Sequence, residues 1–211
     1  MLLKNKVELF VSFFNIQSLE YLDYGPINLQ IEAAEIIGLN GSSGSGKSRL
    51  LRSLADLDEH TGNVLLNSVE QHSLKAYEWR TQVALLSAET YWWLDTVGEH
   101  FKCFSADNAG ALGFENDISM WPVSRLSSGE KQRLGLLRLL ENQPSVLLLD
   151  EPTANLDPEN ERLFENYVMK YVHEKPACAI WVSHDVEQLN RISQRQYKIQ
   201  QGELLNEVKE N

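Results

Sequence analysis

Short apolar runs alternate along the chain with longer stretches in which apolar and polar positions are mixed. Runs rich in Val, Ile and Leu predict buried strands, and we expect such strands at 7–14, 27–31, 35–39, 63–66, 83–86, 145–149 and 177–182. Apolar positions that recur every three or four residues predict helices, here at 49–57, 73–80, 128–142, 158–171 and 186–191. Gln201 and Gly202 predict a turn between two last short strands. This alternation of strands and helices is typical of an α/β fold with a mostly parallel sheet.

The segment from Ser87 to Arg125 follows neither pattern. Glycines interrupt it, and it contains the aromatic group Tyr91-Trp92-Trp93. We interpret it, together with the helix that follows, as a mainly helical subdomain inserted at about 88–142. The whole chain, residues 1–211, has the length of a single domain with such a subdomain.

Charge and cysteine content narrow the class of partner and the compartment. The chain has 19 Lys and Arg against 30 Asp and Glu, a formal net charge of -11. Because this charge repels a phosphate backbone, we expect no nucleic-acid partner.

Cys103 and Cys178 form no ligand cluster, as expected of a reduced compartment. No run approaches the roughly 18 apolar residues of a membrane-spanning helix. No signal-peptide cleavage site follows residues 1–14, so we expect a cytoplasmic protein.

A glycine-rich loop lies between the predicted strand at 35–39 and the predicted helix at 49–57. It matches the phosphate-loop pattern G-x-x-x-x-G-K-S/T at every required position, with the residues Gly41, Ser42, Ser43, Gly44, Ser45, Gly46, Lys47 and Ser48. Such a loop brings backbone N–H groups close to phosphate at a helix N-terminus. Lys47 is expected to bridge the β and γ phosphates of ATP, and the Ser48 hydroxyl to ligate Mg²⁺. A purely structural Gly/Ser loop is the alternative, and the motifs that follow weaken it.

Two other apolar runs end in polar side chains. The run at 146–149 leads into Asp150 and Glu151, and a second strand leads into His184. Parallel sheets bind ligands at the carboxyl ends of their strands, so Asp150 is expected to hold the Mg²⁺ shell through water. The alternatives are a solvated acidic pair and a structural histidine.

The segment Leu126-Ser127-Ser128-Gly129-Glu130 narrows a nucleotide-binding protein to one family. The order of phosphate loop, this segment, Asp150-Glu151 and His184 resembles the ATPase subunit of ATP-binding cassette (ABC) transporters over nearly the whole chain. The small stand-alone subunits, including the iron-export type, are the most similar in plan.

This resemblance implies a complete architecture and a set of partners. The expected fold is a P-loop NTPase core with a mostly parallel sheet, an N-terminal antiparallel β subdomain and the inserted helical subdomain. The expected cofactors are ATP and Mg²⁺. The expected partners are a second copy of the chain in the ATP-bound state and a polytopic membrane subunit, which would hold the chain peripherally on the cytoplasmic face of the membrane.

The resemblance also implies residue roles. Glu151 occupies the position of the residue that polarises the attacking water as general base in the family. His184 occupies the position of the histidine that reaches the γ phosphate. Lys47 is the third member of this expected catalytic group. The signature segment binds ATP across the dimer: Ser127 and Gly129 meet the γ phosphate, and Leu126, Ser128 and Glu130 make up the rest. It departs from the commonest form, Leu-Ser-Gly-Gly-Gln, at Ser128 and Glu130.

Structural roles compete with some of these assignments. Asp157 stands in the D-loop, which contacts the opposite subunit in the family, but an Asp before Pro158 is also a good helix N-cap. Ser127 with Glu130 likewise resembles a capping box. Capping and phosphate binding use the same N–H groups, so both can hold.

The chain departs from the resembled family at three further places. Arg49 stands where threonine is usual, which removes a hydroxyl contact to the α phosphate and keeps the backbone donor. Ala88 stands where the Q-loop glutamine is expected; Glu89 is a candidate substitute, although neighbours on an extended segment face opposite ways. Ala34 replaces a turn glycine. For the aromatic that stacks on adenine, Tyr21 is our choice over Tyr24 and Phe14.

Two other functions stay open at this stage. A soluble ABC-type ATPase that acts on DNA or ribosomes usually has coiled-coil insertions or two cassettes, and the chain has neither. An ATP-gated module that closes but hydrolyses very slowly is suggested by Ala88. The aromatic group at 91–93 follows the position where the family receives its membrane subunit, and packing within the subdomain is the alternative.

Overall fold

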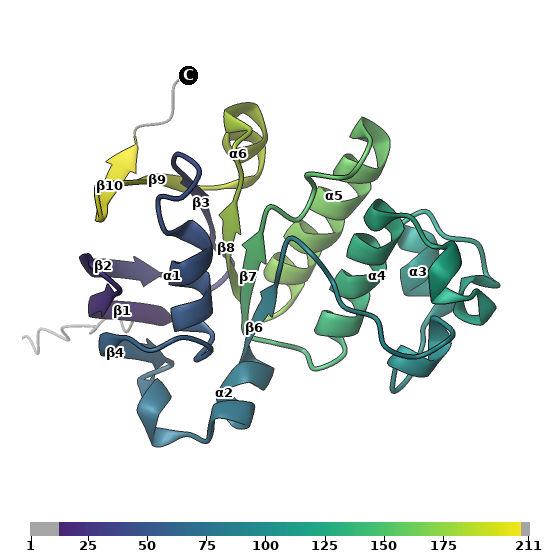
Figure 1. Cartoon of the computed structure of the whole chain (residues 1–211), viewed down its shortest axis with the longest axis horizontal. Coiled ribbons are helices and arrows are strands. Elements are labelled where there is room, and N and C mark those ends of the chain that lie inside the picture. The colour runs from purple at the N-terminus through teal and green to yellow at the C-terminus, as the bar shows by residue number, and fades with distance from the viewer. Residues whose placement is uncertain (1–12, 208–211) are drawn as a thin grey trace, which may run out of the picture.

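The computed structural model describes residues 13–207, which form two β-sheets with helices between and beside them (Figure 1). A four-stranded antiparallel sheet has the order β2-β1-β4-β5, from strands Tyr24–Ile31, Phe14–Tyr21, Thr61–Leu66 and Val69–Glu70. A six-stranded sheet has the order β10-β9-β3-β8-β7-β6, from strands Glu203–Glu207, Arg195–Gln200, Ile36–Asn40, Cys178–Val182, Val146–Asp150 and Val83–Leu86. All of its pairs are parallel except β10 with β9.

The helices form layers on both faces of the six-stranded sheet. They are α1 (Lys47–Leu54), α2 (Ala76–Gln82), α3 (Ala106–Ala111), α4 (Ser128–Leu140), α5 (Pro158–Glu174) and α6 (Val186–Ile192). In Figure 1, α1 lies between the two sheets, whereas α4 and α5 cover the opposite face of the larger sheet. The predicted α/β class, with a mostly parallel sheet and an N-terminal antiparallel sheet, is confirmed.

The central strands are buried on both faces. In β7, Val146 and Leu148 belong to the core shared with α1 and the antiparallel sheet, whereas Leu147 and Leu149 belong to the core shared with α4 and α5. Successive side chains of a strand point to opposite faces, so a strand covered on both sides is apolar at every position. This is why these strands were predictable as continuous apolar runs.

The first strand differs from the prediction. The strand expected at 7–14 lies outside the described residues except for its last two positions, and the structure instead has β1 at Phe14–Tyr21. Ser18 adopts a φ of 48°, and the pairing of β1 with β2 shifts register between Ile16 and Leu19. Such a bulge breaks the two-residue alternation that identifies a half-buried strand, which explains why the pattern missed it.

The segment between β6 and α4 consists of short helices and turns. It contains the six-residue α3 and single turns of 3-10 helix at Gly98–His100, Ile118–Met120 and Val123–Arg125. Its buried side chains Val97, Leu112 and Ile118 join the core formed by α4, α5 and the parallel sheet. Because no separate core sets this part apart, the subdomain boundaries at 88 and 142 stay a prediction.

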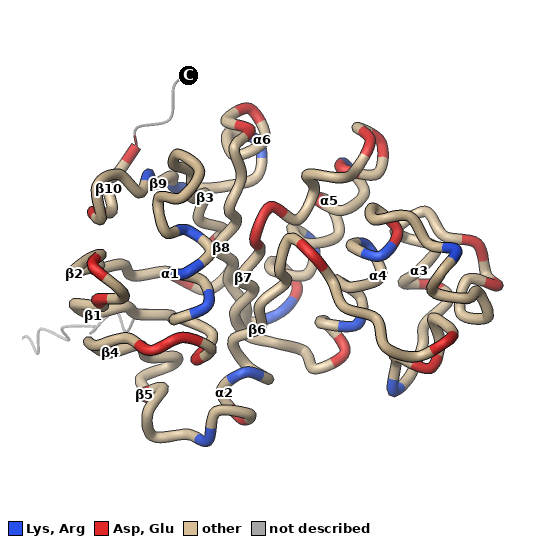
Figure 2. The backbone as a smooth tube through the Cα atoms, viewed as in Figure 1, with Lys and Arg blue, Asp and Glu red and all other residues tan. Residues whose placement is uncertain are grey.

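Charged residues are spread over the described part of the molecule. Figure 2 shows Asp and Glu on strands, helices and loops alike, with Lys and Arg scattered among them. Within residues 13–207, no helix combines the length and apolar character that crossing a bilayer requires.

Candidate functional site

The phosphate loop connects the end of β3 to the start of α1, in the context that its sequence pattern requires. Gly41 has a φ of 146° and Gly46 a φ of 97°. A Cβ atom at Gly41 would lie 2.7 Å from the carbonyl oxygen of Ile199, and one at Gly46 would lie 3.1 Å from the Tyr24 ring. Only glycine combines these backbone angles with so little space.

The first turn of α1 has no internal cap. Gly46, at the N-cap position, offers no side-chain acceptor, and no acidic residue lies in the first turn. The first N–H groups of a helix have no partner within the helix, and the positive end of the helix dipole lies beside them. These donors are therefore available to an anion such as phosphate.

Lys47 is held inside the loop. Its side chain is only 7% exposed, and its Nζ donates to the carbonyl oxygens of Gly41, at 2.8 Å, and Ser42, at 3.2 Å. Burial lowers the pKa of Lys47, while the nearby Glu151 and Asp150 act in the opposite direction. A partly desolvated ammonium group beside the open helix end has the placement that phosphate binding needs.

Asp150, Glu151 and His184 meet at one edge of the parallel sheet. β7 ends at Asp150 and pairs with β8, with Asp150 opposite Val182. Glu151 Oε1 therefore comes within 3.3 Å of His184 Nε2. Glu151 adopts a φ of 46°, a strained conformation for a residue with a side chain. Its N–H donates to the Val182 carbonyl at 3.2 Å.

The environment of Glu151 raises the pKa of its carboxyl group. Burial raises the pKa of Glu151, and the neighbouring His184 and Lys47 limit that rise. The carboxylate atom Oε1 makes no hydrogen bond. A partly buried carboxylate with a raised pKa is typical of a general base.

These groups surround one cavity of about 270 Å³. Its wall contains seven of the predicted site residues from the loop and helix start, together with Asp150, Glu151 and His184; the seven are Ser43, Gly44, Ser45, Gly46, Lys47, Ser48 and Arg49. Gly41 and Ser42 line an adjoining hollow on the other side of His184. The structure thus brings together motifs that are more than a hundred residues apart in the chain.

The oxygen donors at this cavity suit Mg²⁺. Within residues 13–207, no group of three or more His, Cys, Asp or Glu side chains could hold a metal alone. The Ser48 hydroxyl and the Asp150 carboxylate both face the cavity. Mg²⁺ prefers oxygen ligands, keeps several waters and commonly binds with substrate phosphates, so a set of few oxygen donors fits it better than a closed cage would.

Tyr24 lines the phosphate-loop cavity and Tyr21 does not, while the assignment of Tyr21 to adenine stacking stays a prediction. Tyr21 is only 2% exposed and lies in the core beneath the loop, where burial raises its pKa. Tyr24 lines the cavity, and its hydroxyl donates to the Gly44 carbonyl at 3.3 Å. Leu22 lines the cavity too and was not predicted. Phe14 is fully buried in the core.

Arg49 has a partner of its own. Its Nη1 donates to Asp58 Oδ2 at 2.8 Å, and Asp58 also accepts two hydrogen bonds from Arg52. Without the Arg49 side chain, Asp58 would keep its two hydrogen bonds from Arg52. The Asp58 carboxylate therefore does not depend on Arg49 for a partner.

The signature segment and Asp157 act as helix caps in the described chain. Ser127 Oγ accepts from the Glu130 N–H at 3.2 Å, and the Glu130 carboxylate accepts from the Ser127 N–H at 2.8 Å. Asp157 Oδ1 caps α5 by accepting from the N–H groups of Glu159 and Asn160. None of Leu126, Ser127, Ser128, Gly129, Glu130 and Asp157 lines the phosphate-loop cavity of the same chain.

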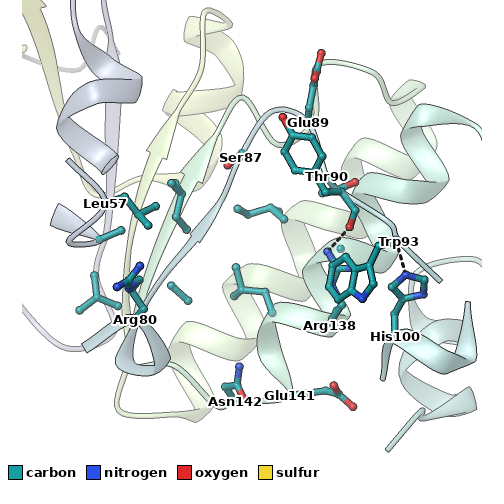
Figure 3. Close-up of a pocket in the computed structure, with 18 of the residues that line it drawn as sticks. Leu57, Arg80, Ser87, Glu89, Thr90, Trp93, His100, Arg138, Glu141 and Asn142 are labelled. Atoms are coloured by element: carbon teal, nitrogen blue, oxygen red, sulfur yellow. Dashed lines mark hydrogen bonds between the residues drawn. The ribbon is translucent and has the colours of Figure 1, made fainter. Parts of the chain in front are cut away.

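A second hollow, which we call the aromatic groove, lies where β6 ends (Figure 3). It measures about 570 Å³ and is lined by β6, α4 and the segment after Ser87. Tyr91 and Trp93 are 74% and 69% exposed. Trp92 is half-buried: its Nε1 donates to Thr90 Oγ1 at 3.2 Å, and it packs on the core.

One arginine and one histidine hold this segment in place. Arg138 donates to the Tyr91 carbonyl at 3.0 Å and lies over the rings of Trp92 and Trp93. His100 Nε2 accepts from the backbone N–H of Trp93 at 3.0 Å, as Figure 3 shows. Glu89 lines the groove, and neither Ala88 nor Glu89 is among the residues around the phosphate-loop cavity.

The sequence profile of the family "ABC transporter" matches residues 24–154 of the chain. The "Probable iron export ATP-binding protein FetA" of Escherichia coli is 33% identical over 177 residues, which cover 78% of this chain and 79% of that protein. The "Aliphatic sulfonates import ATP-binding protein SsuB" of Escherichia coli is 33% identical over 186 residues, or 84% of this chain and 71% of that protein.

Solved structures show the same fold. CbiO1 of Clostridium perfringens, part of the ABC transporter complex CbiONQ, superposes with a TM-score of 0.77 at 21% identity, over 92% of this chain and 87% of its own. A bacterial Atm1-family ABC exporter with ATP bound superposes with a TM-score of 0.79 at 19% identity, over 90% of this chain and 37% of its own.

Proposed function

Because the chain belongs to the ABC transporter family of ATP-binding proteins, we propose that it dimerises around two ATP molecules and drives a separate membrane subunit. The chain is an ATPase subunit of that family. The dimer, the membrane partner, Mg²⁺ and the individual residue roles are the parts that we propose.

The observation that carries this function is the convergence at the phosphate-loop cavity. The open helix end, Lys47, Asp150 and the Glu151–His184 pair all surround one space of about 270 Å³. Each has the chemistry for one part of phosphoryl transfer to water: anion binding, metal binding and activation of water.

Each group around the cavity is assigned one role in ATP hydrolysis. The N–H groups at the start of α1 and the Lys47 ammonium bind the phosphates and stabilise charge that develops on them. The Glu151 carboxylate accepts a proton from the attacking water. His184, 3.3 Å from Glu151, orients that carboxylate and contacts the γ phosphate. Mg²⁺, held by Ser48 and Asp150, would neutralise charge on the β and γ phosphate oxygens.

A second copy is needed to complete the site. The start of α4 carries Ser127 and Gly129 but lies on no nucleotide cavity of its own chain. Glycine at position 129 lets this helix start pack closely on the segment around Asn155 of its own chain, because a Cβ atom would lie 2.8 Å from the Asn155 carbonyl oxygen. In a dimer, this helix end would face the γ phosphate that the partner's phosphate loop holds.

The aromatic groove is the surface that we assign to the membrane subunit. Tyr91 and Trp93 are largely exposed in the groove, and Arg80, Lys102 and Arg138 also line it. Aromatic and Arg side chains are enriched at the centres of protein interfaces. The supporting bonds to His100 and Arg138 hold the segment rigid, so little conformational freedom would be lost on docking.

The dimer is tested by mixing two inactive variants. Lys47→Ala removes a phosphate ligand, and Ser127→Asp keeps an N-cap acceptor while placing a negative charge where the γ phosphate is expected. Each variant alone should hydrolyse almost no ATP. Because a mixed dimer contains one intact composite site, mixing them should restore turnover, and no recovery on mixing would argue against the composite site.

The docking surface is tested by co-purification. Trp93→Ala and Tyr91→Ala should weaken retention of the membrane subunit while leaving ATP binding unchanged. Met120→Ala is the matched control, since Met120 is 76% exposed but does not line the groove. Equal retention of all three variants would rule out the groove as the docking surface.

Ala88 favours one alternative, an ATP-gated module with very slow hydrolysis. Alanine offers neither donor nor acceptor at the Q-loop position. Losing one positioning hydrogen bond should slow turnover by about 10- to 1,000-fold without abolishing it. Ala88→Gln should therefore raise turnover, and Glu89→Ala should leave it unchanged because Glu89 faces the groove. A wild-type chain with no measurable Mg²⁺-dependent phosphate release would support the alternative.

A further inference from the structure

A buried side chain links the two segments that carry Glu151 and His184. Gln188, on α6, is only 1% exposed. Its Nε2 donates to Thr153 Oγ1 at 2.8 Å and to Glu165 Oε1 at 3.0 Å, and its Oε1 accepts from Trp181 Nε1 at 3.3 Å. Both ends of the amide are therefore satisfied, as a buried polar group requires.

The two ends of this link lie next to the catalytic pair. Thr153 follows Glu151 by two residues and is itself buried, and a turn with the Ala154 N–H bonded to the Glu151 carbonyl joins them. On the other side, the Gln188 N–H donates at 3.1 Å to Asp185, the residue after His184. Gln188 thus bonds to the segment after each member of the pair, through its side chain to Thr153 and through its backbone N–H, within the N-cap of α6, to Asp185.

The far side of the network makes the link rigid. Glu165, on α5, is 1% exposed and accepts from Arg191 of α6 as well as from Gln188. Arg191 also pairs with Glu161 at 2.7 Å. Because α5 and α6 are bonded through the buried Glu165 and the partly exposed Arg191, Gln188 has few ways to move without leaving a buried group unpaired.

We propose that Gln188 is a positioning residue for catalysis, which acts through Thr153 and Asp185 to hold Glu151 Oε1 3.3 Å from His184 Nε2. This proposal rests on the proposed function, because it assigns a source to the geometry of that site. Glu151 needs such support, since its positive φ is a strained conformation that the surroundings must maintain.

The link can be broken at Thr153 with little change in shape. Thr153→Val removes the hydroxyl, so one of the two N–H groups of Gln188 Nε2 loses its acceptor while the other keeps its bond to Glu165. Thr153→Ser keeps the hydroxyl and loses a methyl group. Tyr171→Phe is the matched control on α5, because it also removes one hydrogen bond, from Tyr171 to the Pro144 carbonyl.

The steady-state experiment separates positioning from structure. Since misplacement of a catalytic group by about 1 Å costs up to about 100-fold, we expect Thr153→Val to lower kcat by about 10- to 100-fold with ATP affinity unchanged. Its pH–rate profile should shift on the limb assigned to Glu151. Thr153→Ser should recover most of the turnover, and Tyr171→Phe should match wild type. Equal losses in Thr153→Ser and Thr153→Val would assign the effect to packing and overturn the proposal.

Hydrogen exchange decides the proposal independently of turnover. Thr153→Val should accelerate amide exchange together at 151–157 and 184–188, and Tyr171→Phe should not. Faster exchange at 151–157 alone would show that the two segments are not coupled through Gln188. An inactive wild-type chain would count against the proposed function, while the exchange result would still decide the link.

Discussion

The helices α1 and α4 differ in whether the backbone N–H groups at their N-termini are capped by side chains. α1 begins after Gly46 with no side-chain cap and no acidic residue in its first turn. α4 begins with a reciprocal capping box between Ser127 and Glu130. Because helix N-termini attract anions, the first is free to bind phosphate at once, whereas the second is already satisfied by its own chain. From this difference we propose that α1 binds the phosphates within one chain, and that the start of α4 contributes only when a second chain brings a phosphate to it.

The largest effect is expected at the mouth of α1. Glu151→Gln removes the proposed base and keeps the shape of the side chain, so kcat should fall by about 100- to 10,000-fold. ATP binding should persist because Lys47, Ser48 and Asp150 are untouched, and an ATP-bound dimer should accumulate in size-exclusion chromatography. Unchanged turnover would remove Glu151 from its assigned role.

Lysine substitutions test the comparison directly. Lys47→Ala should weaken ATP binding by about 30- to 1,000-fold, since truncating a buried charge that contacts a charged partner costs several kcal/mol. Lys131→Ala, in the first turn of α4, is the control and should leave binding to the single chain unchanged. Titration calorimetry with dilute protein measures both. Similar losses in the two variants would mean that α4 contributes to binding within one chain.

The raised pKa of Glu151 predicts two pH effects. As pH falls through this raised pKa the base becomes protonated, so turnover should decline at a higher pH than an ordinary Glu would give. The folded state also holds this proton more tightly than the unfolded state, so ionisation costs stability as pH rises through the same window. Glu151→Gln should therefore be more stable than wild type at neutral pH, by about 1 kcal/mol.

Denaturant unfolding across pH measures the second effect. The stability difference between the two proteins should shrink as pH falls from neutral through the raised pKa towards the ordinary value for Glu. A difference that grows on acidification would have the wrong sign and would contradict burial as the cause.

The smallest effect concerns the cap of α4. Glu130→Gln removes a negative charge from the helix N-terminus, so the free energy of unfolding should fall by about 0.5 kcal/mol. It should also strengthen ATP-driven dimerisation, because the charge that competes with the γ phosphate is gone. Glu159→Gln in the first turn of α5 is the control: it loses a similar helix-end charge and should not change dimerisation.

Local chemistry determined the parts that the sequence predicted well. The phosphate loop depends on glycine conformations and on N–H groups within a few consecutive residues, so the pattern at 41–48 is sufficient to recognise it. The central strands are buried on both faces and therefore read as unbroken apolar runs. The caps at Ser127 and Asp157 likewise involve partners no more than three residues away.

Pairing between distant segments decided the rest. Tyr21 lies in the core whereas Tyr24 lines the cavity, and spacing along the chain does not distinguish these two positions. The 3.3 Å approach of Glu151 to His184 requires β7 to lie beside β8. Gln188 meets Thr153 across 35 positions. A one-dimensional pattern records the burial of each residue but not its partner, because the partner is chosen when the whole core packs.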